Sequence, residues 1–489
     1  MAEYIIGIDQ STQGTKVMLF DKTGVMKLRV DKSHAQLIND QGWVEHDPDE
    51  IYQNLIALVR QLLETSGIDG NDVAAVGISN QRETALAWEK ATGRKVHNAI
   101  VWQCARGQAI CDRLASRGVS ERVREKTGLR LSPYFSAAKL AWLMENVPGL
   151  RACAEKGEIA CGTMDSYLVH RLTGGVCRTD YSNASRTQLF NIRTLRWDEE
   201  LLAMFGIPAC CMGEVTDSDG LFGDTDFEGL LPRRVPIHGV MGDSHGALFG
   251  QGCLRRGMMK TTYGTGSSIM MNIGDEPVFS GLGLVTSLAW KTGGRVQYVL
   301  EGNINYTGAV ISWLKDDVKL LSSSAESEAL AMSANPADRT YLVPAFSGLG
   351  APYWRGDVSA AMIGMSRTTG RAEIVRAGLE CIAYQITDIV RLMQQEAAIE
   401  KIELRVDGGP TRNRWLMQFQ SDITRCPVLV PAAEELSGIG AAYAAGLGCG
   451  LYTDNVFEGM RYTSFAPEMT QEERARRYGG WQAAVKRVL

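Results

Sequence analysis

The chain has 489 residues with a formal net charge of −5, and 45% of its residues are hydrophobic and 22% are charged. A chain of this length exceeds what one hydrophobic core usually supports, so we expect two domains. The slight acidic excess, without a basic stripe, excludes a typical nucleic-acid-binding protein, and no run approaches the roughly 18 apolar residues of a membrane-spanning helix.

The first 24 residues predict a β-hairpin with a polar tip. Residues 4–9 form a short apolar run that ends in an acid, and residues 16–20 resume the strand pattern before a turn at 21–24. The tip between them, residues 10–15, is rich in small hydrogen-bonding residues and contains one glycine. These features are typical of two paired strands joined by a tight connection.

A helix is predicted to begin directly after Asp47. Asp47 is a suitable N-cap, Pro48 suits the first helical position, and Glu50 stands in the first turn. The apolar residues that follow recur on one helical face: Ile51, Leu55, Leu58, Val59 and Leu62. A strand over residues 73–78 comes next, and this alternation of strand and helix indicates an α/β domain.

The second half of the chain repeats the pattern of a strand followed by a turn of small residues. Strands are predicted at 235–240, 258–262 and 402–406, and the latter two run into the glycine-rich turns 263–268 and 407–409. A long amphipathic helix is predicted to carry Val375, Leu379, Ile382, Ile386, Ile389 and Met393 on its apolar face. We place the domain boundary near residues 245–255, which divides the chain into 1–248 and 249–489.

The hairpin tip and the glycine turns are candidates for binding phosphate. One such turn is usually only a turn. Phosphate oxygens, however, need exposed backbone N–H groups and short hydroxyl side chains at close range, and turns from two domains could contact phosphates from both sides. The sequence has neither a Walker lysine motif nor the glycine loop and His-Arg-Asp motif of protein kinases.

Two acids stand where phosphoryl transfer would need them. That reaction requires a metal to offset the phosphate charge and a carboxylate to take the proton of the attacking hydroxyl. Asp9 and Asp243 each follow an apolar strand, where a carboxylate would point into a cleft. Either acid could equally cap the following helix, and the residues alone leave both interpretations open.

Six longer segments, in order along essentially the whole chain, resemble the glycerol kinase branch of the FGGY carbohydrate kinase family. They are residues 77–84 (GISNQRET), 98–103 (NAIVWQ), 134–143 (YFSAAKLAWL), 180–187 (DYSNASRT), 262–266 (TYGTG) and 407–409 (DGG). The resemblance implies two α/β domains of the ribonuclease H-like, actin and hexokinase type. It also implies that ATP and the substrate bind in the cleft between the domains.

The same resemblance assigns roles to individual residues. Asp243 would be the general base, and Asp9 would hold Mg²⁺ through water. The residues expected to contact ATP are Thr12, Gln13, Lys16, Thr265, Gly308, Ser312, Gly409 and Asn413. Those expected around the substrate are Arg82, Glu83, Trp102, Tyr134, Asp243, Ser244 and Ser268. Lys16 stands where glycerol kinases usually carry arginine, which keeps the charge but loses the two-pronged geometry.

Two departures from the glycerol kinase pattern affect the expected substrate. Ser244-His245-Gly246 replaces two glutamines and an alanine, and Ser268 replaces a phenylalanine that packs on the glycerol carbons. Both changes remove bulk, so we expect a larger, more hydroxylated acceptor of about four to six carbons. His245 would either hydrogen-bond that extra length or face the interior. Residues 224–234 lack the glycine-rich basic loop that binds a sugar bisphosphate regulator, so that feedback is not expected.

The leading hypothesis is an ATP-dependent kinase that phosphorylates a hydroxyl of glycerol or of a larger polyol or sugar. The alternatives are a ketose kinase of the xylulose or ribulose type and, in another class, a nucleotide-binding sensor or actin-like protein without catalysis. The eleven cysteines follow no framework spacing, which is typical of reduced thiols in the cytoplasm. We expect a small-molecule substrate, no nucleic acid, no membrane insertion, and a homodimer or homotetramer as in similar enzymes.

Overall fold

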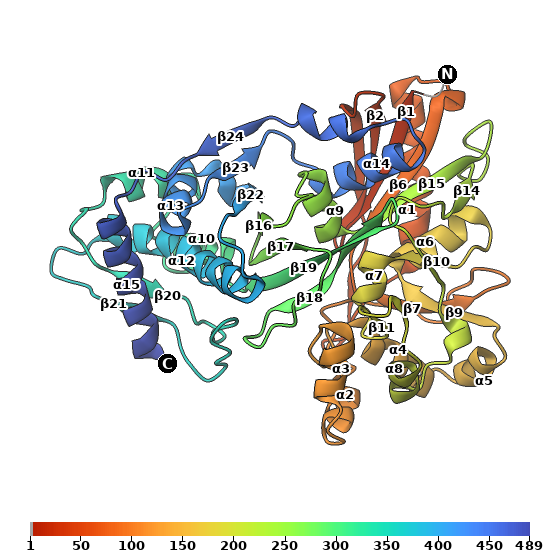
Figure 1. Cartoon of the computed structure of the whole chain (residues 1–489), viewed down its shortest axis with the longest axis horizontal. Helices are drawn as coiled ribbons and strands as arrows, with labels where there is room; N and C mark the ends of the chain where they lie inside the picture. The colour runs from red at the N-terminus through yellow and green to blue at the C-terminus, as the bar shows by residue number, and fades with distance from the viewer. Residues whose placement is uncertain (1–2) are drawn as a thin grey trace.

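The computed structural model describes residues 3–489, and the chain folds into two α/β lobes, each built on one large mixed sheet (Figure 1). The first sheet has six strands in the order β14-β15-β6-β1-β2-β3. Its strands are β1 (Tyr4–Gln10), β2 (Gly14–Asp21), β3 (Met26–Ser33), β6 (Val73–Asn80), β14 (Gly223–Thr225) and β15 (Val235–Gly242).

The predicted hairpin and the first predicted helix are confirmed. β1 and β2 pair antiparallel with Asp9 opposite Lys16, and the tip closes where the Ser11 N–H donates to the Gly14 carbonyl at 2.9 Å. Helix α1 (Pro48–Ser66) begins after Asp47, whose side chain accepts from the backbone N–H groups of residues 49 and 50. Its apolar stripe is buried against the first sheet, which explains why the local pattern alone located this helix.

The second sheet has seven strands in the order β18-β19-β17-β16-β22-β23-β24. Its strands are β16 (Met258–Tyr263), β17 (Ser267–Gly274), β18 (Val285–Thr292), β19 (Arg295–Ile304), β22 (Glu403–Asp407), β23 (Val428–Pro431) and β24 (Tyr462–Phe465). The predicted long amphipathic helix is α12 (Arg371–Ala397), and its apolar residues complete the core of this lobe. The strands predicted at 258–262 and 402–406 correspond to β16 and β22.

The remaining elements surround the two sheets. A five-stranded sheet of order β4-β5-β8-β7-β9 comprises β4 (Leu37–Ile38), β5 (Val44–His46), β7 (Ala85–Glu89), β8 (Ala99–Ile100) and β9 (Ile159–Thr163). Three two-stranded sheets comprise β10 (Arg178–Asp180) with β13 (Glu214–Thr216), β11 (Phe190–Asn191) with β12 (Arg196–Trp197), and β20 (Tyr341–Val343) with β21 (Ala361–Ile363). The other helices of the first half are α2 (Gln108–Ala115), α3 (Ser120–Thr127), α4 (Ser136–Asn146), α5 (Leu150–Glu155), α6 (Met164–Thr173), α7 (Tyr181–Ser185), α8 (Glu199–Phe205) and α9 (Asp243–Gly250). Those of the second half are α10 (Gly308–Ser312), α11 (Glu326–Ser333), α13 (Arg414–Thr424), α14 (Leu436–Gly448) and α15 (Gln471–Val488).

Helix α14 lies on the first sheet although it comes late in the chain. It packs on β1, β6, β15 and α9, and Figure 1 shows it in blue beside the red strands of the N-terminal sheet. Glycines permit this close approach, since a β-carbon at Gly77 would collide with the Ala441 carbonyl and one at Gly440 with the Gly246 carbonyl. The domain boundary at 248/249 stays a prediction. The chain returns from the second lobe to the first sheet at α14.

Between residues 3 and 489, no helix combines the length and the apolar character needed to cross a bilayer.

Candidate active site

Three neighbouring parallel strands of the first sheet bring the predicted acids together. β1, β6 and β15 are parallel neighbours, with Asp9 opposite Ser79 and Gly242 opposite Asn80. Because their carboxyl ends meet at one edge of the sheet, Asp9 at the end of β1 and Asp243 just after β15 lie near each other. This edge is where open α/β sheets usually bind ligands.

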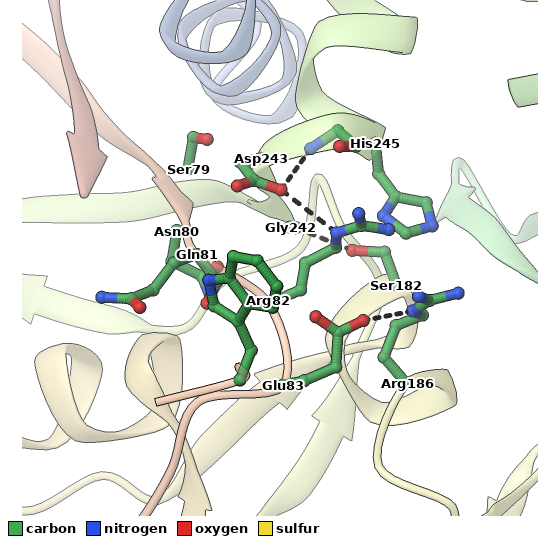
Figure 2. A network of polar contacts seen from close by, with 12 residues as sticks. Ser79, Asn80, Gln81, Arg82, Glu83, Ser182, Arg186, Gly242, Asp243 and His245 are labelled. Atoms are coloured by element: carbon green, nitrogen blue, oxygen red, sulfur yellow. Dashed lines mark hydrogen bonds and ion pairs between the residues drawn. The ribbon is translucent and has the colours of Figure 1, made fainter. Parts of the chain in front are cut away.

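Asp243 is the first residue of α9, and its carboxylate is partly accessible and held on one side (Figure 2). Its side chain is 33% exposed. Its Oδ1 accepts from the Nε–H of Arg82 at 3.1 Å and from the N–H of Ser244 at 2.6 Å. The backbone just before it is fixed as well, since the Gly242 N–H donates to the hydroxyl of Ser182 at 2.9 Å. Such a carboxylate is oriented by hydrogen bonds and still has one oxygen without a partner among the described residues.

Asp9 is buried beside this site. The hydroxyl of Ser79 donates to its Oδ1 at 3.0 Å, and Nζ of Lys16 lies 3.9 Å from its Oδ2. Burial raises the pKa of Asp9 to about 6; Lys16 opposes the rise and the Asp243 carboxylate adds to it. Asp9 has only one cation nearby, and the Asp243 carboxylate keeps one oxygen free of Arg82, so the two acids are a suitable oxygen donor set for Mg²⁺.

Residues 3–489 contain no group of three His, Cys, Asp or Glu side chains that could cage a metal by themselves. This is compatible with Mg²⁺, which usually takes one or two carboxylates from the protein and its other ligands from water and phosphate. The Lys16 ammonium is paired within the protein: its Nζ donates to Glu435 Oε2 at 2.6 Å, at the start of α14. Its predicted contact with phosphate stays a prediction.

A chain of alternating buried charges extends from Asp243 into both lobes. Arg82 donates to the Glu301 carboxylate at 3.0 and 3.3 Å, and Arg186 lies 2.9 Å from the same carboxylate. Arg186 also donates to Glu83 at 2.6 Å, a contact drawn in Figure 2. Burial alone would raise the pKa of Glu301, but Arg186 and Arg82 lower it well below its ordinary value. The side chains of Arg82 and Glu83 are thus linked through Glu301 and Arg186, two residues that we did not predict.

The predicted aromatic residues form a second wall next to the hairpin tip. The rings of Trp102 and Tyr134 meet edge to face with centroids 5.5 Å apart, and the indole N–H of Trp102 donates to the Thr12 hydroxyl at 3.0 Å. The Lys139 ammonium donates to the backbone carbonyls of residues 133, 134 and 135 at 2.6, 2.5 and 3.1 Å, and so fixes the segment that carries Tyr134. The hairpin tip and the aromatic wall are therefore one connected structure. Gln13, also at the tip, is exposed.

His245 and Ser268, two of the residues that depart from the glycerol kinase pattern, differ in their surroundings. His245 is fully buried, and its Nε2 lies 3.4 Å from the Ser287 hydroxyl, so it faces the interior; this favours the second of the two predicted alternatives. Burial, and then the neighbouring Arg82 and Arg186, lower the pKa of His245 well below its ordinary value. The hydroxyl of Ser268 is buried and has no hydrogen-bond partner within residues 3–489.

A cavity of about 980 Å³ lies in the second lobe and is lined by residues between 263 and 416. Five of the eight predicted ATP-contacting residues line it: Thr265, Gly308, Ser312, Gly409 and Asn413. The turn 264–266 is held against α10 because the Gly308 N–H donates to the Gly264 carbonyl at 2.9 Å. The Asn413 side chain caps α13 by accepting from the Leu416 N–H at 2.9 Å.

Sequence reasoning missed the aromatic side of this cavity. Tyr306, Trp313 and Phe346 line it, and the rings of Trp313 and Phe346 lie 4.9 Å apart. Flat apolar rings beside glycine turns suit a nucleoside base next to its phosphates. Trp313 could have been found, because it directly follows the predicted Ser312, whereas Phe346 comes from a distant loop.

Comparison with known proteins agrees with this geometry along the entire chain. The N-terminal domain of the FGGY family of carbohydrate kinases matches residues 4–250, and its C-terminal domain matches residues 259–449. Glycerol kinase 1 of Thermotoga maritima is 48% identical over 490 residues, covering 99% of this chain and 99% of the relative. A glycerol kinase of Symbiobacterium thermophilum is 46% identical over 489 residues, covering 99% of this chain and 98% of the relative.

Solved structures confirm the predicted fold class of two α/β domains of the actin and hexokinase type. Plasmodium falciparum glycerol kinase, solved with ADP, superposes with a TM-score of 0.95 at 34% identity, covering 99% of this chain and 98% of that one. A xylulose kinase from Lactobacillus acidophilus shares the fold with a TM-score of 0.87 at 22% identity, covering 99% of this chain and 97% of that one. From these matches and from the site geometry it follows that the chain belongs to the FGGY family of carbohydrate kinases.

Proposed function

We propose that this chain transfers the γ-phosphoryl group of ATP to a hydroxyl of a small polyol, with Asp243 as the general base. The observation that carries the proposal is the position of Asp243. It is partly exposed at the end of a central strand, oriented by Arg82, and next to a second carboxylate at Asp9. A carboxylate so placed can accept the proton of an attacking hydroxyl as the new O–P bond forms.

The polyol would lie between the charged chain and the aromatic wall. Arg82 donates and Glu83 accepts hydrogen bonds, so together they can hold neighbouring hydroxyls, and the rings of Trp102 and Tyr134 can cover the carbon edge. ATP would occupy the cavity of the second lobe with its phosphates toward the turn that contains Thr265. Asp9 would hold Mg²⁺ through water, and the ion would offset the phosphate charge. Thr12, Gln13 and Lys16 would bind phosphate from the hairpin side.

The acceptor is proposed to be glycerol or a longer polyol. The curated relatives named above are glycerol kinases, whereas the xylulose kinase shares the fold at only 22% identity, which makes the ketose kinase alternative the weaker one. Ser268 and Ser244 favour the longer acceptor, because the unpartnered Ser268 hydroxyl offers a hydrogen bond where an apolar wall is expected. We further propose a cytoplasmic homo-oligomer whose only substrates are small molecules.

The test is a coupled assay of ADP release over a panel of polyols and ketoses, with purified wild type, Asp243→Asn and Asp224→Asn. Asp224 is an exposed carboxylate on the edge strand of the same sheet and serves as the matched control. We expect Asp243→Asn to lower kcat by about 10²- to 10⁴-fold, the range for loss of a general base, while ATP still binds. The control should keep wild-type activity.

Three results would contradict parts of the proposal. Unchanged turnover in Asp243→Asn would remove Asp243 from the mechanism. A kcat/KM for glycerol far above that for every longer polyol would refute the enlarged pocket. ATP binding without phosphorylation of any acceptor would favour a nucleotide-binding sensor.

A further inference from the structure

We infer that Glu301, a residue of the second sheet, is a positioning residue that fixes Arg82 for acceptor binding and for contact with the general base. The inference rests on the proposed function, in which Arg82 binds the polyol. It adds a specific role for the second lobe, which would shape the polyol site as well as hold the nucleotide.

The ion pairs of Glu301 are with two arginines of this site, Arg82 and Arg186. Its side chain is 1% exposed, and its two carboxylate oxygens accept from the two terminal nitrogens of Arg82 at 3.0 and 3.3 Å. The paired geometry holds the guanidinium plane in one orientation. Arg82 Nε is then directed at Asp243 Oδ1, at 3.1 Å. Moving or neutralising Glu301 would therefore release the group that orients the base.

Glu301 is also the only carboxylate in the described chain that pairs with both Arg82 and Arg186. Arg82 and Arg186 are 7% and 1% exposed, and the positive charge of Arg82 opposes the charged form of Arg186. A buried pair that loses one partner is strongly destabilised, because the remaining charge is neither solvated nor neutralised. Without Glu301, Arg82 would be expected to move toward water and away from the acceptor position.

The strand register places Glu301 beside the proposed extra space in the pocket. In the pairing of β17 with β19, Ser268 is opposite Asn303, and Glu301 is two residues before Asn303 on β19. Side chains two residues apart on a strand lie on the same face of the sheet, and Asn303 Nδ2 donates to Glu301 Oε1 at 3.4 Å. The face that holds Arg82 is thus the face that carries Ser268.

The geometry leaves donors of Arg82 for the substrate. A guanidinium has five N–H groups. Three of them are used by Asp243 Oδ1 and by the two oxygens of Glu301. The remaining two belong to the terminal nitrogens and have directions fixed by the Glu301 contact. An acceptor hydroxyl would therefore meet donors that are already oriented, which lowers the entropic penalty of binding.

The experiment compares Glu301→Gln and Glu301→Asp with Glu403→Gln, a control on strand β22 of the same sheet whose carboxylate pairs with Arg405 at 2.7 Å. Steady-state KM and kcat are measured for the acceptor and for ATP, and calorimetry measures acceptor binding without ATP. We expect Glu301→Gln to lower acceptor kcat/KM by about 10²- to 10³-fold, mainly through acceptor KM, which is the range for a broken buried ion pair. The KM for ATP should change by less than about threefold, since Glu301 does not line the nucleotide cavity.

Glu301→Asp keeps the charge with a shorter reach, so it should recover about tenfold of the loss, and it replaces Glu301→Gln if the latter does not fold. The inference would be overturned if the folded variants kept the acceptor KM within about threefold of wild type, or if the KM values for acceptor and ATP rose together, as a general loss of structure would cause. Failure of the proposed function is a separate result, because it would appear as a wild-type enzyme that phosphorylates no polyol.

Discussion

Replacing Asp165 by Asn should stabilise the protein at neutral pH and remove part of its pH dependence. Asp165 is fully buried in α6, and its oxygens accept from the hydroxyls of Thr163 at 2.5 Å and Thr179 at 2.6 Å. Burial, followed by repulsion from Asp180, raises its pKa from 3.8 to about 6. At about 1.4 kcal/mol per pKa unit, the charged Asp165 destabilises the folded state by about 3 kcal/mol at pH 7.

The sign follows from the proton balance. Between pH 3.8 and about 6 the folded state binds more protons at Asp165 than the unfolded state does. The favourable contribution of Asp165 protonation to the stability of the folded state is therefore fully present below pH 3.8. It is lost as the pH rises through about 6. Asparagine can still accept from one threonine and donate to the other, so most of the hydrogen bonding is kept.

The assay is urea denaturation of wild type and Asp165→Asn, followed by circular dichroism at about pH 5 and about pH 7.5. We expect the advantage of the variant in unfolding free energy to grow by about 1.4 kcal/mol between these conditions. Asp40→Asn, which removes an exposed carboxylate, controls for the change in net charge. An advantage that stays constant with pH, or a variant less stable than wild type at the higher pH, would refute the reasoning.

Two further predictions concern the two ligands. Ser268→Phe should raise the ratio of kcat/KM for glycerol to kcat/KM for a five-carbon polyol by about tenfold or more, because the ring fills the space at the unpartnered Ser268 hydroxyl. Ser268→Ala is the control. An unchanged ratio in Ser268→Phe would show that this position does not contact the acceptor. Gly308→Ala should raise the KM for ATP by about tenfold, because its β-carbon would lie 2.7 Å from the Gly264 carbonyl oxygen and push the turn away. Gly479→Ala adds a β-carbon with no neighbour within 4 Å and should be silent, and equal KM values in both glycine variants would contradict the steric explanation.

Local signals predicted strands β1 and β15, at whose ends Asp9 and Asp243 lie, and the long helices α1 and α12. The capped start at Asp47 and the apolar stripe of α12 depend on neighbouring residues, so they could be read from the sequence. Asp243 and Arg82 lay in recognisable segments. Glu301 was missed because its partners are distant in sequence, although an acid inside the apolar run of β19 was a usable signal. The site is formed by contacts between the two lobes, and the periodicity of apolar residues along the sequence does not indicate which residues of the two lobes meet.

His245 and Lys16 are two residues whose side-chain partners could not be predicted from the sequence. For His245 the sequence left two alternatives, contact with the acceptor or burial, and for Lys16 the family resemblance implied contact with phosphate. Burial against Ser287 turns His245 inward, and Glu435, 419 residues further along the chain, accepts a hydrogen bond from the Lys16 ammonium, whose contact with phosphate stays a prediction. A side chain's direction depends on which partner arrives from elsewhere in the fold, and that partner is not visible in the local pattern.

The return of α14 to the first sheet has a consequence for biosynthesis. The strands β1, β6 and β15 emerge from the ribosome long before residues 436–448, yet these residues cover them and pack through Gly77 and Gly440. Until then the nascent N-terminal lobe would expose an apolar face that normally contacts α14, a surface of the kind chaperones bind. The two lobes therefore complete their folding together, and a fragment ending at residue 250 should aggregate unless a peptide corresponding to α14 is supplied.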